Sequence, residues 1–255
     1  MDLTNIGCNK INRHQRDSRC KFYPESHTYE IDESTYRSVT TIISSFFSVF
    51  DADDAIEKMK NGRNWNPGNK YWGMQDFEIK QLWEENGIRA SEQGTFLHEQ
   101  IEKFYLDEKY EEPTEFSHFL DFAKEHNFLN PFRTEWRIFD ERFKIAGTID
   151  FIAENNGNLE IYDWKRSLKV INKQSGLPIT ENPWDRGFKG LNDMGDTSYN
   201  HYVLQLSMYR YLLERNYGIL ISNMFIVVLH PEYEQYYKVH VPYKKEKVEY
   251  ILSTL

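Results

Sequence analysis

The sequence has little cysteine: its 255 residues include only Cys8 and Cys20. Two cysteines are too few for a disulfide framework, a four-thiolate zinc site or a four-thiolate iron–sulfur cluster, so we expect reduced thiols. Long apolar runs are also missing, because residues 219–229 are short and broken by Ser222 and Asn223, whereas a membrane span needs about 20 apolar residues. The polar, basic start lacks the apolar core of a signal peptide. These absences predict a soluble intracellular protein with no membrane contact.

An excess of positive charge is missing as well, since the formal net charge is −9. This balance argues against a protein that coats nucleic acid through its overall potential, although a local basic groove remains compatible with it. Basic side chains gather on or just after residues 159–165, and the candidates for such a groove are Lys165, Arg166, Lys169, Lys173, Arg186 and Lys189. Aromatic residues make up 16% of the chain, which would suit base stacking, although most of them are expected in the core.

Hydrophobic residues make up 40% of the chain, enough for a full core. The first half is expected to be mostly helical, with a hairpin over 22–31, a helix entered at 38–43 that a threonine could cap, and helices over 52–60, 75–85, 92–106 and 115–126. The second half is expected to alternate strands over 133–139, 142–153, 159–165, 223–229 and 236–241 with a helix over 198–215. We therefore expect an α/β core over 91–255 and a helical extension over 1–90 packed on it, as one compact unit overall.

The most informative local feature is the Asn156-Gly157 pair between two strands. Asn-Gly favours the two-residue type I′ turn, and this turn sets Asn155 opposite Asn158 and, counting outward, Asp150 opposite Asp163. Opposed side chains have Cβ atoms about 5 Å apart, and like charges there destabilise a sheet. The pair therefore calls for a compensating cation, and a divalent metal is the natural candidate.

Strand periodicity places Lys165 on the same face as Asp163, beside the carboxylate pair. Two acids that hold a hard cation next to a lysine would stabilise the negative charge that develops when water attacks a phosphodiester. The alternative is a solvated edge hairpin with incidental charges, since Asp and Lys are common on exposed strands.

A long segment without periodicity, residues 172–197, joins this strand to the next helix and is rich in Gly, Pro, Asn and Asp. Such loops in compact domains are usually functional or disordered. Its position favours a loop that covers substrate.

Two helices carry polar residues at inward positions. His98 borders the apolar stripe of Leu97, Ile101 and Tyr105, either as a hydrogen-bonded core residue or as a ligand. Gly94, one turn earlier, suggests close approach of another backbone, because glycine inside a helix costs up to ~1 kcal/mol relative to alanine. In the later helix Gln205 lies inward, with Tyr209 one turn beyond it. A buried amide needs partners, so Gln205 either braces backbone near a site or satisfies a loop.

Four segments taken together resemble the ordered motifs of the PD-(D/E)XK nucleases: Gly94 to His98, Gly147 to Asp150, Asp163-Trp164-Lys165, and Gln205 to Tyr209. The resemblance is to the RecB-like branch, which also holds CRISPR-associated and mitochondrial exonucleases, and it covers about residues 89–213. Residues 38–41 also resemble viral and phage members of that branch.

The resemblance implies a mixed central sheet flanked by helices and a site for one or two Mg²⁺ or Mn²⁺ ions. His98, Asp150, Asp163 and the Trp164 carbonyl would be metal ligands, and Lys165 would position or activate the attacking water. Gln205 and Tyr209 would brace the site or contact the DNA backbone. Glu135 would support the ligands or hold a second metal, unless it forms a structural ion pair with Arg137 or a neighbour.

The implied activity is hydrolysis of DNA at its ends, leaving a 5′-phosphate and a 3′-hydroxyl, in replication, recombination or repair. The alternatives are a structure-specific endonuclease and a non-catalytic DNA-end-binding subunit. A non-haem iron oxygenase is disfavoured, because such sites generally use two histidines and one carboxylate. The chain departs from members that carry four cysteines for an iron–sulfur cluster, and it has no Gly-Lys-Ser or Gly-Lys-Thr phosphate loop. We therefore expect a stand-alone nuclease or a subunit whose motor, or whose replication or recombination partner, is another protein.

Overall fold

The computed structural model describes residues 6–255. The chain divides into two compact units, of which one holds the described residues up to Ser48 together with Leu97–Leu255 and the other holds Val49–Phe96. These units do not follow the division expected at residue 90, because the segment before Ser48 contributes three strands to the central sheet.

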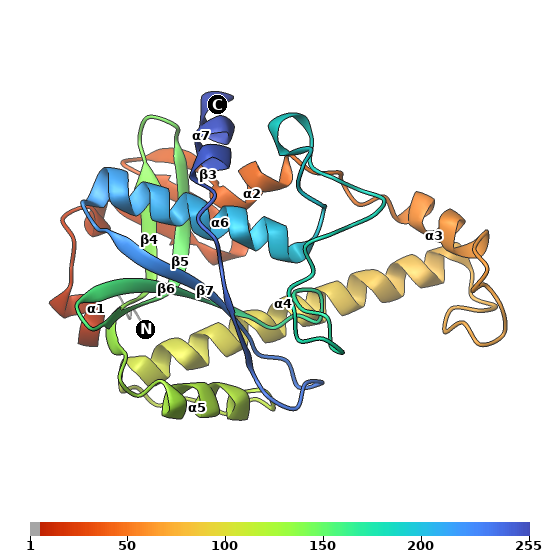
Figure 1. Cartoon of the computed structure of the whole chain (residues 1–255), viewed down its shortest axis with the longest axis horizontal. Helices are drawn as coiled ribbons and strands as arrows, with labels where there is room; N and C mark the ends of the chain where they lie inside the picture. Colours follow the sequence, from red (N-terminus) through yellow and green to blue (C-terminus); the bar gives the residue numbers. More distant parts are fainter. Residues whose placement is uncertain (1–5) are drawn as a thin grey trace. The chain divides into compact units, whose positions relative to one another are not determined.

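The first unit is built on an eight-stranded sheet in the order β1-β2-β3-β5-β6-β7-β8, with β4 paired to β5 (Figure 1). The pairs β3–β5 and β6–β7 are parallel and the others are antiparallel. The mixed sheet predicted from the sequence is thus confirmed. The strands are β1 (Cys20–Tyr23), β2 (Thr28–Ile31), β3 (Ser34–Ser38), β4 (Asn130–Asp140), β5 (Ile145–Asn155), β6 (Asn158–Lys165), β7 (Ile221–Val228) and β8 (Tyr237–His240).

The described helices are α1 (Gly7–Ile11), α2 (Val39–Ser44), α3 (Ala52–Lys60), α4 (Asp76–Tyr105), α5 (Phe116–Glu125), α6 (Ser198–Leu212) and α7 (Lys245–Ser253). Short 3₁₀ turns lie at Asp17–Arg19, Pro24–Ser26 and Lys189–Leu191, and a π turn at Leu213–Tyr217 ends α6. The α4 helix is continuous where two helices were expected, because a glycine costs only about 1 kcal/mol and the residues around Gly87 are good helix formers. Ser38, rather than a threonine, caps α2 by accepting a hydrogen bond from the Thr41 amide.

The hairpin between β5 and β6 has the predicted turn and register. Asn156 and Gly157 have φ angles of 50° and 79°, as a type I′ turn requires, and Asn155 pairs with Asn158. The same register continues to the pair Phe151–Tyr162 and ends there, so the expected strand pair Asp150–Asp163 is not formed.

The strand β3 was missed in the sequence because its turn lacks the usual residues. Asp32 and Glu33 take φ angles of 47° and 66° at the β2–β3 connection, where glycine or asparagine would be expected. The short strand that follows brings the N-terminal hairpin into the central sheet through its parallel pairing with β5.

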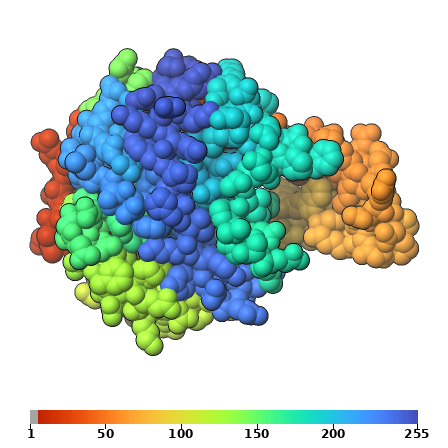
Figure 2. Space-filling model, viewed as in Figure 1, coloured from red at the N-terminus to blue at the C-terminus, as the bar shows by residue number. Residues whose placement is uncertain are grey.

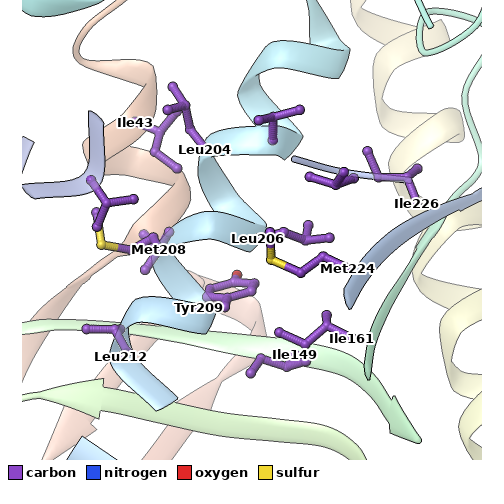
Figure 3. Packing of buried hydrophobic residues seen from close by; sticks show 14 of the residues in the cluster. Ile43, Ile149, Ile161, Leu204, Leu206, Met208, Tyr209, Leu212, Met224 and Ile226 are labelled. Atoms are coloured by element: carbon purple, nitrogen blue, oxygen red, sulfur yellow. The ribbon is translucent and has the colours of Figure 1, made fainter. Parts of the chain in front are cut away.

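Helices cover both faces of the sheet. On one face, side chains of α2 and α6 such as Ile43, Leu206 and Tyr209 pack against Ile149 and Ile161 of β5 and β6 (Figure 3). On the other face, α5 and the turns of α4 from Leu97 onward bury a second cluster, which includes Leu97, Ile101, Phe119, Phe151 and Trp164. The expected packing of the His98 helix against the hairpin is therefore confirmed.

The sheet divides at the middle of β5. The strand β4 pairs along the whole of one edge of β5, whereas the other edge pairs with β3 at Ile145 and Ala146 and with β6 from Phe151 onward. Residues 147–150 therefore have no strand partner on that second edge. We call this gap the fork, and it leaves space for side chains where a strand would otherwise lie.

The segment 172–197 packs against the C-terminal helix. Lys247 Nζ donates to the Gly190 carbonyl at 2.9 Å and lies 2.5 Å from Asp193 Oδ1, and a Cβ on Gly190 would meet the Tyr250 ring at 2.5 Å. Figure 2 shows this segment, in teal, beside the dark blue C-terminal residues. These contacts hold the segment against α7. That the segment covers substrate stays a prediction.

The second unit has a small core of its own, formed by Ile56, Tyr71 and Ile79. Asp51 caps α3 by accepting hydrogen bonds from two amides, and Trp83 Nε1 donates to the Tyr71 hydroxyl at 2.8 Å. In the described part of the chain, no helix has both the length and the apolar character that crossing a membrane requires.

Candidate metal and active site

Three residues from three different elements converge beside the fork. His98 comes from α4, Glu135 from β4 and Asp150 from β5. His98 Nδ1 lies 3.7 Å from Glu135 Oε1 and 3.6 Å from Asp150 Oδ2, and one ligand atom from each residue lies within 4.8 Å of the others. We call these three residues the His–acid cluster.

The backbone of β4 is irregular at Glu135. Glu135 lies opposite Asp150, between the pairs Thr134–Phe151 and Trp136–Ile149, and has a φ angle of 43° although it is in a strand. Such backbone strain costs about 1–3 kcal/mol for a residue with a side chain and is found most often at functional sites. The expected alternative, an ion pair of Glu135 with Arg137, does not appear in the described residues; its charged neighbour is His98.

Asp163 and Lys165 stand next to the cluster on β6, as the strand period predicted. Lys165 Nζ lies 2.6 Å from Asp163 Oδ2 and 4.0 Å from Asp150 Oδ2, so the ammonium bridges the two carboxylates. The Trp164 amide donates to Asp150 Oδ2 at 2.8 Å. Asp163 is 2% exposed, and its Oδ2 atom lies against the Lys165 ammonium. A buried carboxylate needs a cation beside it, and Lys165 supplies that charge here.

The Trp164 carbonyl oxygen lies 2.8 Å from His98 Nε2. Two arrangements fit this distance. In one, Nε2–H donates to the carbonyl and leaves the Nδ1 lone pair facing the carboxylates, as is usual for histidines that bind metals. In the other, both atoms are neighbouring ligands of one octahedral ion, which at bond lengths of about 2.1 Å would lie about 3 Å apart.

The charges of the site shift its pKa values strongly. Burial by itself lowers the pKa of His98, but the carboxylates of Asp150 and Glu135 outweigh it and raise that pKa to about 9. Burial raises the pKa of Asp163 to about 6 against the opposing effect of Lys165, and burial also raises the pKa of Asp150. Without a cation His98 therefore keeps a proton at neutral pH, which a bound metal would replace.

The donor set fits a hard divalent cation. Carboxylate oxygens with one imidazole nitrogen are ligands that Mg²⁺ and Mn²⁺ accept. The distances from His98 Nδ1 to Asp150 Oδ2 and to Glu135 Oε1 are 3.6 and 3.7 Å. In an octahedron, neighbouring ligand atoms lie about 3 Å apart and opposite ones about 4.2 Å, so both distances fall within this range. The cluster does not contain two histidines, so it does not match an oxygenase triad.

Tyr209 fills the fork from the side of α6. A Cβ on Gly147 would lie 2.5 Å from Tyr209 Cε1 and 3.0 Å from its hydroxyl, so the ring rests directly on the β5 backbone. Gln205 Nε2 donates to the same hydroxyl at 3.3 Å. The expectation that Gly94 is approached closely by another backbone was wrong, because a Cβ there would meet nothing within 4 Å; the close approach is at Gly147.

The basic residues proposed for a DNA groove are not one group. Arg166 forms an ion pair with Glu115 in which both side chains are largely buried, so its guanidinium stabilises the fold. Arg186 pairs with Glu181 at 2.9 Å. Lys169, Lys173 and Lys189 are exposed. A different basic group, Arg133 and Arg137, was not expected from the sequence. These residues flank Glu135 at a spacing of two, the period of a strand, and this spacing was the signal that could have revealed them.

A His–acid cluster beside a lysine is an arrangement that could hold a divalent ion next to a phosphate group. The comparison with protein families agrees: residues 78–251, more than half of the chain, match the PD-(D/E)XK nuclease superfamily. The chain belongs to this superfamily.

No curated protein matches the chain. Among solved structures it is similar to one titled "Crystal structure of SSO0001", with 14% sequence identity and a TM-score of 0.36. The match covers 88% of this chain and 76% of that chain. A likeness this distant carries no argument about activity.

Proposed function

We propose that this protein is a deoxyribonuclease that uses Mg²⁺ or Mn²⁺ to hydrolyse phosphodiester bonds at DNA ends, leaving a 5′-phosphate and a 3′-hydroxyl. The observation that carries the proposal is the convergence of His98, Glu135 and Asp150 with Asp163 and Lys165 at the fork. Membership of a nuclease superfamily supports phosphodiester chemistry. A role in replication, recombination or repair, with DNA as the partner, extends this proposal.

The ligands proposed for the first ion are His98, Asp150 and Asp163, with the Trp164 carbonyl. Glu135 joins the set, since its carboxylate is as near to His98 as that of Asp150. A bound divalent ion would supply Lewis-acid stabilisation of the charge that develops on the phosphate oxygens. The burial of Asp163, with the Lys165 ammonium between its carboxylate and that of Asp150, supports its assignment as a ligand.

Lys165 is proposed to orient the attacking water and to stabilise negative charge on the phosphate. The neighbouring acids support this role, because Asp163 and Asp150 hold the pKa of Lys165 above its usual value against the effect of burial. A protonated lysine donates hydrogen bonds and does not accept a proton, so it acts here as a charge and a positioning group.

Gln205 and Tyr209 are proposed as positioning residues. The Tyr209 ring supports the β5 backbone three residues before Asp150, and the Gln205 amide fixes the hydroxyl of that ring. Both side chains are buried, which supports bracing of the site over direct contact with DNA.

Catalysis is tested with Asp163→Ala and Lys165→Ala. Both variants are expected to lose metal-dependent cleavage of end-labelled DNA while they retain the fold, because these side chains lie at the fork outside the apolar clusters. Asp121→Ala and Lys124→Ala on the exposed face of α5 are the matched controls and should cleave normally. Full cleavage by both fork variants would refute the assignment.

Action at ends is tested separately with linear and circular DNA, single- and double-stranded. The proposed exonuclease leaves circles intact with either metal, whereas cleavage of circles would establish the structure-specific endonuclease. If calorimetry found no metal binding at all, the protein would instead be a non-catalytic DNA-end-binding subunit.

A further inference from the structure

A cavity of about 520 Å³ adjoins the His–acid cluster through Glu135, which lines both. The cavity lies between β4 and the chain from residue 13 to β1. Four cationic side chains line it, namely Arg13, Lys21, Arg133 and Arg137, together with the aromatic rings of Phe22 and Trp136. This concentration of positive charge is unusual in a chain whose net charge is −9.

The other acid of the cavity, Asp17, is already satisfied. Its Oδ2 atom accepts hydrogen bonds from Arg133 Nη1 at 2.8 Å and from the His14 amide at 2.9 Å, and its Oδ1 atom accepts one from Trp136 Nε1 at 2.8 Å. Asp17 therefore holds the wall together and does not neutralise the remaining cations.

The cations that line this space differ in their partners. Arg133 is 3% exposed, and its Nη1 donates to Asp17 Oδ2 at 2.8 Å and to the Asn12 carbonyl at 3.0 Å, so it belongs to the wall of the cavity. Arg137 is half-buried, and no carboxylate of residues 6–255 lies within ion-pair distance of it; the centre of the Phe22 ring lies 6.0 Å from its Cζ atom. A half-buried guanidinium without an ion pair is costly unless an anion satisfies it.

We propose that this cavity binds the phosphorylated terminal nucleotide of a DNA strand, with its phosphate monoester at Arg13 and Arg137. The inference rests on the proposed function, because it places the next phosphodiester of the strand at the His–acid cluster. Guanidinium groups bind phosphate by paired, charge-assisted hydrogen bonds. The volume is in the range of small-ligand sites, and the rings of Phe22 and Trp136 offer apolar surface to the base and sugar.

The cationic residues of the cavity indicate how much negative charge its ligand carries. A terminal phosphate monoester carries about −1.5 to −2 charges at pH 7, whereas each internal diester carries one. The cavity retains two cations without an ion pair, Arg13 and Arg137, beside the neutralised Arg133–Asp17 pair. It therefore favours a strand end that carries a phosphate over an end that carries a hydroxyl.

The test measures binding in chelator, so that no cleavage is required. Single strands of one sequence, with an internal fluorophore and a phosphate at the 5′ end, at the 3′ end or at neither, are titrated with the protein. One phosphorylated strand is expected to bind at least about tenfold more tightly than the unphosphorylated strand, as expected for charge-assisted hydrogen bonds. Which end it is defines the polarity of the bound strand.

Arg137→Gln should abolish this preference, and Arg13→Gln, which changes an exposed side chain, should reduce it without risk to the fold. Arg142→Gln is the matched control on the exposed β4–β5 turn and should retain it. Equal binding of all three strands, or an unchanged preference in both cavity variants, would overturn the assignment. If the protein bound a free nucleoside monophosphate but bound all three strands equally, the assignment would also be overturned, and the cavity would be a site for mononucleotides.

The two proposals fail separately. Metal-dependent cleavage by a protein that ignores the end phosphate refutes the cavity assignment alone. A phosphate preference that Arg137→Gln abolishes, in a protein that cleaves no DNA with either metal, refutes the nuclease proposal and leaves the cavity as an end-binding site.

Discussion

The substitution Gly147→Ala probes how the fork is held. The added Cβ would lie 2.5 Å from Tyr209 Cε1, so the ring would have to move by about 1 Å to reach ordinary van der Waals contact. Tyr209 is 4% exposed and cannot move into solvent. The backbone itself accepts alanine, because Gly147 is not among the residues with positive φ.

Overpacking of a buried site costs about 1–3 kcal/mol, and the smaller entropy of unfolded alanine returns only about 0.4–1 kcal/mol. We therefore expect a net loss of about 1–2 kcal/mol in the free energy of unfolding, which is a fall of roughly 2–8 °C in Tm for a chain of this size. Cleavage should fall more steeply than stability, because Asp150 follows three residues later on the same strand and its position controls the His–acid cluster.

Urea denaturation and cleavage of end-labelled DNA measure the two effects. Gly87→Ala is the matched control, since a Cβ there meets nothing within 4 Å in an exposed helix position, and it should stabilise the protein by about 0.5–1 kcal/mol. In the double variant Gly147→Ala/Tyr209→Leu the loss should be smaller than the sum of the single losses, by about 0.5–3 kcal/mol. If Gly147→Ala were as stable and as active as the natural chain, the ring would not be resting on β5 and the bracing role of Tyr209 would be refuted.

Three further outcomes follow from the same structure. His98→Ala should raise the Mg²⁺ concentration needed for half-maximal cleavage by about tenfold or more, because it removes one donor of the cluster; an unchanged metal dependence in a titration would contradict its assignment as a ligand. Arg166→Ala should lower the free energy of unfolding by about 3 kcal/mol, because it leaves the buried Glu115 carboxylate without its partner. DNA affinity measured by anisotropy should change little. Unchanged stability with weaker DNA binding would show instead that Arg166 contacts DNA. Ser38→Ala removes the cap of α2 and should cost about 1 kcal/mol in thermal denaturation, whereas an unaltered Tm would show that the cap is replaced by other contacts.

The hairpin and its register could be predicted because local chemistry fixes them. Asn156-Gly157 selects one turn type, and the turn fixes the pairs from Asn155–Asn158 to Phe151–Tyr162. The strand period then placed Lys165 beside Asp163 without any knowledge of the fold. The helical stripe through Leu97 and Ile101 likewise gave the buried face of α4 next to His98.

Other features depend on contacts between distant segments and leave little local trace. The fork at Gly147 exists because β3 and β6 share one edge of β5, and no single strand pattern reports this. The positive φ of Glu135 likewise has no signal in the pattern of β4. The close approach was therefore assigned to Gly94 when it is at Gly147. Arg166 was read as a groove residue because its partner Glu115 lies 51 positions away. The cavity was missed because its walls come from residues more than a hundred positions apart.

Diffraction from crystals soaked in Mn²⁺, recorded at the manganese absorption edge, tests the metal centre most directly. The anomalous difference map should show a peak within about 2.5 Å of His98, Asp150 and Asp163 side-chain atoms, and the peak should disappear in Asp150→Asn. A fully occupied peak elsewhere on the chain, or none at saturating Mn²⁺, would contradict the assignment of this site.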